Sequence, residues 1–213
     1  FPDEVYNELA IQHKQGEYVS GLQSVGCKVN PTQALPYVKT RVSEILDNGI
    51  KFNSWFVDCD ATGEIYDDYS PEHISSKQQD YDARLERLDA IADEYKMVVG
   101  SEGGNDYAAN SIAFAHGIEL PSFSWMDDDM NQNRDSEYYM GRWYAAAGGV
   151  PEKFSLAVPV KDEYKAIFMN QKYNVPLYKI VYNNAVITSY HWDWSTLKIK
   201  DEEDFRMLYE MLY

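Results

Sequence analysis

The sequence predicts an α/β fold with a parallel β-sheet, either open or closed into a barrel. Short apolar runs alternate with amphipathic stretches at helical spacing, and this alternation is typical of βα units. No low-complexity segment, linker or internal repeat interrupts the 213 residues. Because a complete (β/α)8 barrel needs about 250 residues, we expect the C-terminal portion of a TIM-type barrel, roughly its last five-eighths.

The first half contains the clearest elements. The first predicted helix begins at Thr32, a residue type that caps helices, and ends before Gly49. In the second helix, Leu85, Leu88 and Ile91 recur at helical spacing. The predicted elements are, in order, strand 18–25, helix 32–48, strand 52–58, helix 76–95 and strand 97–100.

The second half continues the alternation with shorter apolar runs. A polar stretch rich in Asp and Asn separates its first helices. The predicted elements are helix 107–113, loop 127–135, helix 138–147, strands 154–160, 178–182 and 186–190, and a closing helix 201–212.

The composition and the net charge of the chain indicate which classes of binding partner to expect. The hydrophobic content of 45% indicates a folded protein, and 35 acidic against 19 basic residues give a net charge of −16. Such a charge repels phosphate backbones and anionic lipids, so we expect no nucleic acid and no membrane as partners. An acidic surface that only serves solubility is the alternative explanation of the charge. Cys27 and Cys59 are too few for a disulfide framework or a zinc cluster.

The two ends of the chain suggest a piece of a larger protein. It begins at Phe1 without an initiator Met and stops at Tyr213 inside a predicted helix. We therefore expect one partial domain over residues 1–213, with the N-terminal part of the barrel missing. No apolar stretch approaches the roughly 18 to 20 residues that span a bilayer. The compartment, cytoplasmic or secreted, stays open.

Carboxylates follow two apolar strands at the point where each strand ends. Asp58 directly follows one strand, and alternation places Asp60 on the same face; Glu102 follows the next strand, ahead of Gly103 and Gly104. Ligands of parallel α/β folds bind at such strand ends. Because the gap of 102 − 58 = 44 residues is one βα unit, we expect Asp58 and Glu102 to face each other. An acidic strand end that only caps the next element is the alternative.

Two facing carboxylates fit glycoside hydrolysis, in which one attacks or stabilises the anomeric carbon and the other protonates the leaving oxygen. An aromatic segment after a later strand adds to this interpretation, because indole rings stack on sugars while Asp and His bind hydroxyls. Trp192 and Trp194 could equally pack in the core. The expected substrate-binding residues are Asp60, Asp106, His191, Trp192, Asp193 and Trp194.

The acidic loop from Asp127 to Asp135 is a candidate for a cation. Its oxygen ligands at alternate positions resemble a calcium loop, but it lacks the glycine at the sixth position and the closing Glu. The loop is therefore not an EF-hand. Calcium stays a candidate beside a solvated acidic loop, and we expect no other cofactor.

Several segments together resemble the catalytic barrel of glycoside hydrolase families 129 and 101. The resemblance covers about residues 19–213. The segments that carry it are WFVDCD (55–60), YSPEH (69–73), the helix with Asp82, Arg84 and Leu85, VGSEGG (99–104), PLY (176–178) and YHWDW (190–194).

The resemblance implies a retaining enzyme that acts on α-linked N-acetylgalactosamine, with a (β/α)8 barrel flanked by β domains. Its nucleophilic aspartate falls on Asp58 and its acid/base glutamate on Glu102. A carbohydrate substrate follows, and any flanking β domains are absent from this chain.

Two other classes remain as alternatives. Asp58 and Asp60 also fit the opening motif of haloacid-dehalogenase-type phosphatases, in which the pair Asp127 and Asp128 would hold Mg²⁺. That interpretation leaves Glu102 and the aromatic segment without a role. The other alternative is a barrel that binds glycans without cleaving them.

Overall fold

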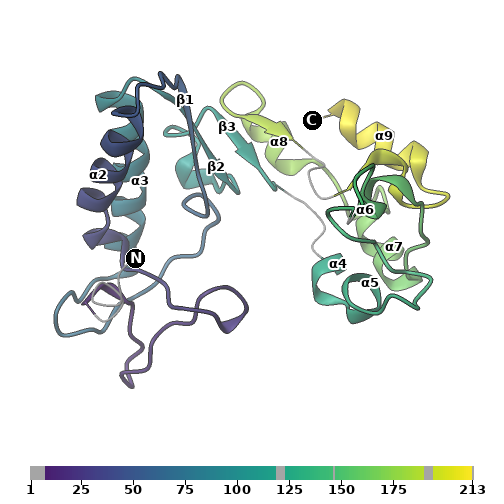
Figure 1. Cartoon of the computed structure of the whole chain (residues 1–213), viewed down its shortest axis with the longest axis horizontal. Helices are drawn as coiled ribbons and strands as arrows, with labels where there is room; N and C mark the ends of the chain where they lie inside the picture. The colour runs from purple at the N-terminus through teal and green to yellow at the C-terminus, as the bar shows by residue number, and fades with distance from the viewer. Residues whose placement is uncertain (1–7, 119–122, 146, 190–193, 213) are drawn as a thin grey trace. The chain divides into compact units, whose positions relative to one another are not determined.

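Figure 1 shows the computed structural model of the chain, in which residues 8–118, 123–145, 147–189 and 194–212 are described. The fold is α/β with a parallel pair of strands, as the alternating pattern predicts. The chain divides into two compact units, Phe1–Phe114 and Ala115–Tyr213. Each unit buries apolar side chains of its own. The single domain expected over residues 1–213 stays a prediction.

The first predicted strand, 18–25, is wrong. The segment forms isolated antiparallel bridges, among them Ser20 with Cys27, and a short 3-10 helix, η1 (Leu22–Ser24). The chain reverses where the Gly21 amide donates to the Gly26 carbonyl, at 3.0 Å. This turn leaves Leu22 and Val25 exposed, so the apolar run has no sheet to join.

The first predicted helix is confirmed with a different start. A 3-10 turn, η2 (Pro31–Gln33), leads into α2 (Leu35–Leu46). Asn30, rather than Thr32, caps the 3-10 turn, because its side chain accepts from the Thr32 amide at 2.9 Å. The helix α2 itself begins after Ala34 without a side-chain cap. Val42 is buried on the inner face of α2.

The strands β1 (Ser54–Val57) and β2 (Val98–Glu102) pair in parallel, and β1 lies at the edge of the sheet. The crossover between them contains α3 (Lys77–Glu94), which buries Leu88 and Ile91 and contacts both β2 and α2. Ser76 and Gln79 form a capping box at the start of α3. Both strands and the helix are therefore predicted correctly to within a few residues.

The segment after β2 differs from its prediction. In place of a helix over 107–113, the chain forms a 3-10 turn, η3 (Asp106–Ala108), and then β3 (Phe114–His116). The Ala113 amide donates to the Val99 carbonyl at 2.8 Å, which brings the start of β3 beside β2. Gly100 is needed there, because a Cβ atom on it would lie 2.2 Å from the Phe114 ring.

The second unit consists mainly of short helices. Its described elements are α4 (Phe123–Met126), α5 (Asp128–Asn131), α6 (Glu152–Ser155), α7 (Asp162–Phe168), α8 (Leu177–Tyr182), β4 (Ile187–Ser189), η4 (Thr196–Lys198) and α9 (Glu203–Leu212). Its core packs Phe123, Met130, Met140, Val158, Val160, Trp194 and Ile199.

The closing helix and the strand near residue 187 are confirmed as α9 and β4, but three other predictions for this unit are wrong. Segment 178–182 is the helix α8, in which the Tyr178 and Tyr182 rings lie 4.7 Å apart. Segment 154–160 ends α6 and keeps only a parallel bridge between Val158 and Ile199. The described part of 138–147 contains no helix.

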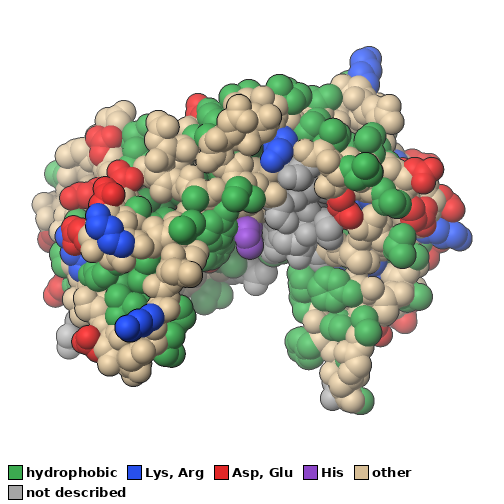
Figure 2. Space-filling view, turned by 90° about the horizontal axis from the view of Figure 1, so that it is seen from above, with side chains coloured by type: hydrophobic (Ala, Val, Ile, Leu, Met, Phe, Trp, Pro, Cys, Tyr) green, Lys and Arg blue, Asp and Glu red, His purple; other side chains and the backbone are tan. Residues whose placement is uncertain are grey.

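Hydrophobic side chains reach the surface of both units, as the green areas of Figure 2 show.

Among the described residues, no helix combines the length and the apolar character that crossing a membrane requires.

Candidate active site

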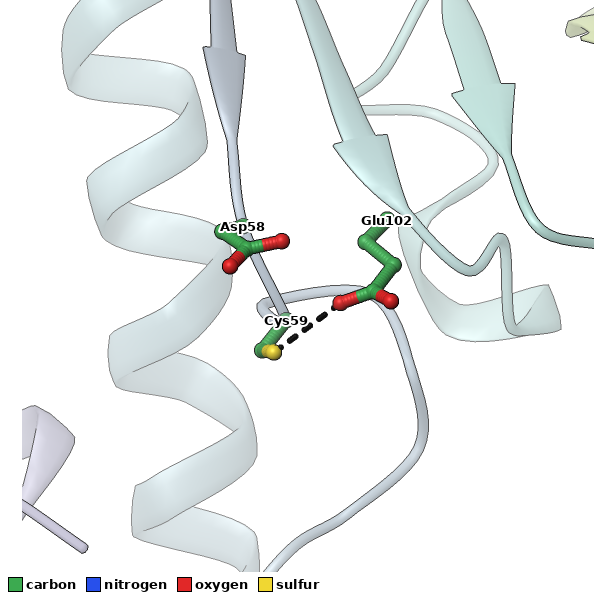
Figure 3. A group of neighbouring side chains, drawn as sticks. All are labelled: Asp58, Cys59 and Glu102. Atoms are coloured by element: carbon green, nitrogen blue, oxygen red, sulfur yellow. Dashed lines mark hydrogen bonds between the residues drawn. The ribbon is translucent and has the colours of Figure 1, made fainter. Parts of the chain in front are cut away.

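The register of β1 and β2 brings Asp58 and Glu102 together. Val57 pairs with Ser101, so the next residue of each strand, Asp58 and Glu102, extends from the same end of the pair. One carboxylate oxygen of each residue and the Cys59 sulfur all lie within 4.8 Å of one another (Figure 3). Asp58 is exposed and Glu102 is half-buried, so both can meet a ligand from solvent.

Ser101 and Gly103 fix the backbone at these strand ends. The buried Ser101 Oγ donates to the Val57 carbonyl at 2.7 Å and accepts from the Ala61 amide at 3.1 Å. Gly103 has a φ of 69°, and a Cβ atom there would lie 2.7 Å from the Thr62 Cα. The loop after β1 is therefore packed against the loop after β2, which restricts how far the two carboxylates can separate.

Cys59 lies between the two carboxylates. Its backbone adopts a φ of 65°, in the left-handed region that residues with a Cβ rarely adopt. Its thiol donates to Glu102 Oε2 at 3.0 Å. Cys59 is exposed as a residue. Partial burial of its sulfur, followed by the bond to Glu102, raises the pKa of the Cys59 thiol to about 12, so the thiol stays protonated near neutral pH. The sequence reasoning did not find this contact, because nothing in the pattern marks a left-handed turn at Cys59.

Asp60 is not part of the group formed by Asp58, Cys59 and Glu102, although it lines the same groove as Asp58. It is 5% exposed, forms an ion pair and a short hydrogen bond with Arg87, and lies 3.5 Å from Arg84. Burial raises the pKa of Asp60 above its usual value, and the two arginines oppose that rise. The left-handed turn at Cys59 explains the difference from the expected alternation, because it rotates Asp60 toward α3. Asp60 is thus a buried ion-pair partner in the described structure.

The other expected site residues have different surroundings. Asp106 is exposed in the first unit and accepts from the Tyr107 amide at 2.9 Å. Trp194 is 2% exposed in the core of the second unit, where its ring lies 5.3 Å from the Arg206 guanidinium. His191, Trp192 and Asp193 lie outside the described residues. Sugar binding by these residues stays a prediction, and the burial of Trp194 does not support it.

The acidic loop 127–135 is engaged in contacts of its own. Asp127 caps α5, and Lys161 donates to Asp127 at 2.8 Å and to Asp129 at 2.9 Å. The hydrogen bond from Lys161 lowers the pKa of Asp127. Where side chains are described, the grouping with metal-ligand spacing is Asp58, Cys59 and Glu102, and exposed acidic groups of this kind are common without an ion. Calcium at the loop stays untested.

A groove of about 1040 Å³ opens beside Asp58, between α2, β1 and α3. Tyr37, Trp55 and Phe56 line it together with Asp58, whereas Glu102 does not. Aromatic faces beside a carboxylate can stack on a sugar ring while the carboxylate binds a hydroxyl or the anomeric carbon. Sequence reasoning missed Tyr37, because its helical position becomes relevant only once α2 packs beside β1.

Comparison with known proteins identifies the family. The family model described as glycosyl hydrolases related to GH101 family, GH129, matches residues 1–213. The chain belongs to glycoside hydrolase family 129. No curated protein sequence matches it.

Solved structures show the same fold as this family 129 chain. The ligand-free alpha-N-acetylgalactosaminidase NagBb from Bifidobacterium bifidum has a TM-score of 0.54 at 20% identity, over 84% of this chain and 24% of that chain. The GalNAc complex of NagBb has a TM-score of 0.55 at 17% identity, over 96% of this chain and 32% of that chain. The family 129 chain therefore spans about a quarter to a third of the length of NagBb.

Family 129 membership confirms the resemblance drawn from the sequence motifs. The family also disfavours the phosphatase alternative. That alternative requires Asp60 as a free acid/base group, whereas in this family 129 chain the Asp60 carboxylate is buried against Arg87 and Arg84.

Proposed function

We propose that the protein is a retaining glycoside hydrolase that acts on α-linked sugars, with Asp58 as the nucleophile and Glu102 as the acid/base. The main support is that one oxygen of the Asp58 carboxylate and one oxygen of the Glu102 carboxylate lie within 4.8 Å of each other at the ends of paired parallel strands. Retaining enzymes hold their carboxyl groups about 5 to 5.5 Å apart, and inverting enzymes roughly 6.5 to 9.5 Å apart to admit a water. The spacing favours retention.

The different surroundings of the two residues support the assignment of roles. Asp58 lines the aromatic groove, so its carboxylate can approach the anomeric carbon of a sugar stacked there. Glu102 lies beside the groove and can donate a proton to the glycosidic oxygen as the bond to the leaving group breaks. In the second step Glu102 takes a proton from water, which attacks the anomeric carbon and releases Asp58.

The substrate class we propose is a carbohydrate with an α-linked N-acetylgalactosamine. The family and the named activity of NagBb support this choice, and the aromatic side chains of the groove fit a sugar ring. His191, Trp192 and Asp193 remain candidates for contacts to the sugar. A barrel that binds glycans without cleaving them is the outcome to be excluded by experiment.

We also propose that the chain is the C-terminal portion of a (β/α)8 barrel that forms a single domain. β1 is at the edge of the sheet, so its outer backbone groups are available to an additional parallel strand. The likeness to NagBb over a part of its length is consistent with such a strand lying upstream in the full-length protein.

The proposal is tested by kinetics of the full-length protein that contains this chain. Asp58→Asn should lower kcat/KM by roughly 10⁴-fold or more for every substrate, because each one needs the nucleophile. Glu102→Gln should lower kcat/KM by roughly 10²- to 10⁴-fold for alkyl or peptidyl glycosides. It should spare aryl glycosides whose leaving groups need little protonation.

Asp89→Asn is the matched control, because Asp89 is an exposed carboxylate on α3 that neither lines the groove nor belongs to the group around Glu102. It should leave kcat/KM unchanged for both classes of substrate. Full activity of Asp58→Asn would contradict the assignment of the nucleophile. A wild-type protein that binds sugars but cleaves no α-glycoside would support the binding barrel instead.

A further inference from the structure

We propose that Cys59 is a positioning residue for Glu102: its thiol holds one oxygen of the Glu102 carboxyl and leaves the other oxygen to exchange protons with the substrate. This inference rests on the proposed role of Glu102 as the acid/base.

The Cys59 thiol forms a hydrogen bond to one oxygen of the Glu102 carboxyl. The Cys59 Sγ lies 3.0 Å from Glu102 Oε2 and donates to it (Figure 3). Within the described ranges no other side chain or backbone hydrogen bond to the Glu102 carboxyl is found. Ser101 fixes the backbone beside Glu102, with Oγ at 3.2 Å from the Glu102 carbonyl. The thiol is thus the group that restrains the end of the Glu102 side chain.

The backbone of Cys59 makes this contact possible. Asp58 extends from the end of β1. The left-handed φ of 65° at Cys59, the following residue, directs the Cys59 side chain toward β2. A residue with a Cβ in this conformation costs on the order of 1 to 3 kcal/mol, and such conformations cluster at functional sites. Glycine would adopt it without that cost. The hydrogen bond to Glu102 explains why position 59 has a side chain rather than glycine.

The thiol is suited to donate throughout the reaction. Its pKa of about 12 keeps the proton on sulfur at neutral pH. A thiol supplies one donor, and here it is directed at Oε2, so the acidic proton of Glu102 is left on Oε1. That oxygen can give the proton to the glycosidic oxygen and later accept one from water.

The experiment compares Cys59→Ala, Cys59→Ser and Cys59→Gly in the full-length protein, each with and without Glu102→Gln. Loss of one hydrogen bond to an ionisable partner should lower kcat/KM of Cys59→Ala by roughly three- to tenfold on an alkyl glycoside. Cys59→Ser should recover most of this loss, because its hydroxyl also donates. The loss should shrink as the leaving group becomes more acidic.

Cys59→Gly separates positioning from backbone strain. It should raise the thermal midpoint, because glycine accepts the left-handed turn, and it should still lose activity as Cys59→Ala does. Cys27→Ser is the control for removing a thiol elsewhere and should leave kcat/KM unchanged. Full activity of Cys59→Gly on an alkyl glycoside would overturn the proposal.

The decisive comparison uses a phenyl glycoside, which Glu102→Gln should still cleave at a measurable rate. If Cys59 acts through Glu102, Cys59→Ala should cause no further loss in the Glu102→Gln background. An equal loss in both backgrounds would overturn the inference while leaving the proposed function intact. Failure of the proposed function itself would appear differently, as undiminished activity of Glu102→Gln alone on an alkyl glycoside.

Discussion

The backbone of Cys59 gives two nearby aspartates different surroundings. Asp58, before the turn, is exposed beside Glu102, whereas Asp60, after it, is buried against Arg87. Strand alternation would have put both on one face. One left-handed residue therefore separates an exposed carboxylate beside Glu102 from a buried carboxylate that forms ion pairs with α3.

Loss of the Asp60 charge should destabilise the fold. Asp60→Ala leaves the largely buried Arg87 guanidinium without its carboxylate and removes one of two carboxylates near Arg84. Removing one partner of a buried ion pair costs about 3 kcal/mol or more, so the free energy of unfolding in urea should fall by that amount. The exposed Asp89→Ala should change it by less than about 0.5 kcal/mol. Equal, small effects of both variants would show that the Asp60 ion pairs contribute little.

At the scale of elements, the long periodic segment of α3 was predicted correctly, whereas short apolar runs were predicted correctly at β1, β2 and β4 and wrongly elsewhere. α3 combines a capping box with buried Leu88 and Ile91 at helical spacing, so its sequence favours one structure. The run at 178–182 has only five residues, four of them apolar or aromatic, and so short a run suits a strand and a helix equally. The segment forms α8, in which no residue is buried.

The capping box of α3 gives a direct test of what stabilises the crossover between the two strand ends. Ser76 Oγ accepts from the Gln79 amide at 3.3 Å, and the Gln79 side chain accepts from the Ser76 amide at 2.9 Å. Ser76→Ala should lower the free energy of unfolding by about 1 kcal/mol, whereas Ser76→Gly should cost only a few tenths. Urea denaturation of the three proteins measures the difference. An alanine variant as stable as the glycine variant would contradict this role of the cap.

At the scale of the whole molecule, the sequence was sufficient to predict that Asp58 and Glu102 lie together, but not to predict which residues surround them. A spacing of one βα unit between two strand ends predicts that two side chains meet, because parallel strands end at one edge. The position of the Cys59 thiol depends on a turn conformation, and the position of the Tyr37 ring depends on how α2 packs. No residue pattern specifies either feature. Sequence alone also could not decide that Trp194 packs in a core.

The partial-barrel proposal predicts how the chain behaves when it is expressed alone. β1 is an edge strand, and Phe56 on it is 42% exposed. Open strand edges and exposed apolar side chains favour association. Light scattering should give an oligomer or aggregate for residues 1–213 alone and a defined species for the full-length protein. A clean monomer of 24.6 kDa with a sharp thermal transition would contradict the proposal.

The central claim is that Asp58 and Glu102 act as the nucleophile and acid/base of a retaining glycosidase. The most direct test is azide rescue of Glu102→Gln in the full-length protein, with an activated aryl α-glycoside as substrate. Azide needs no general base, so it should accelerate cleavage of the glycosyl-Asp58 intermediate. Proton NMR of the product should then show a glycosyl azide with the α configuration. A β-configured azide, or no rescue with an unchanged rate of hydrolysis, would contradict these roles.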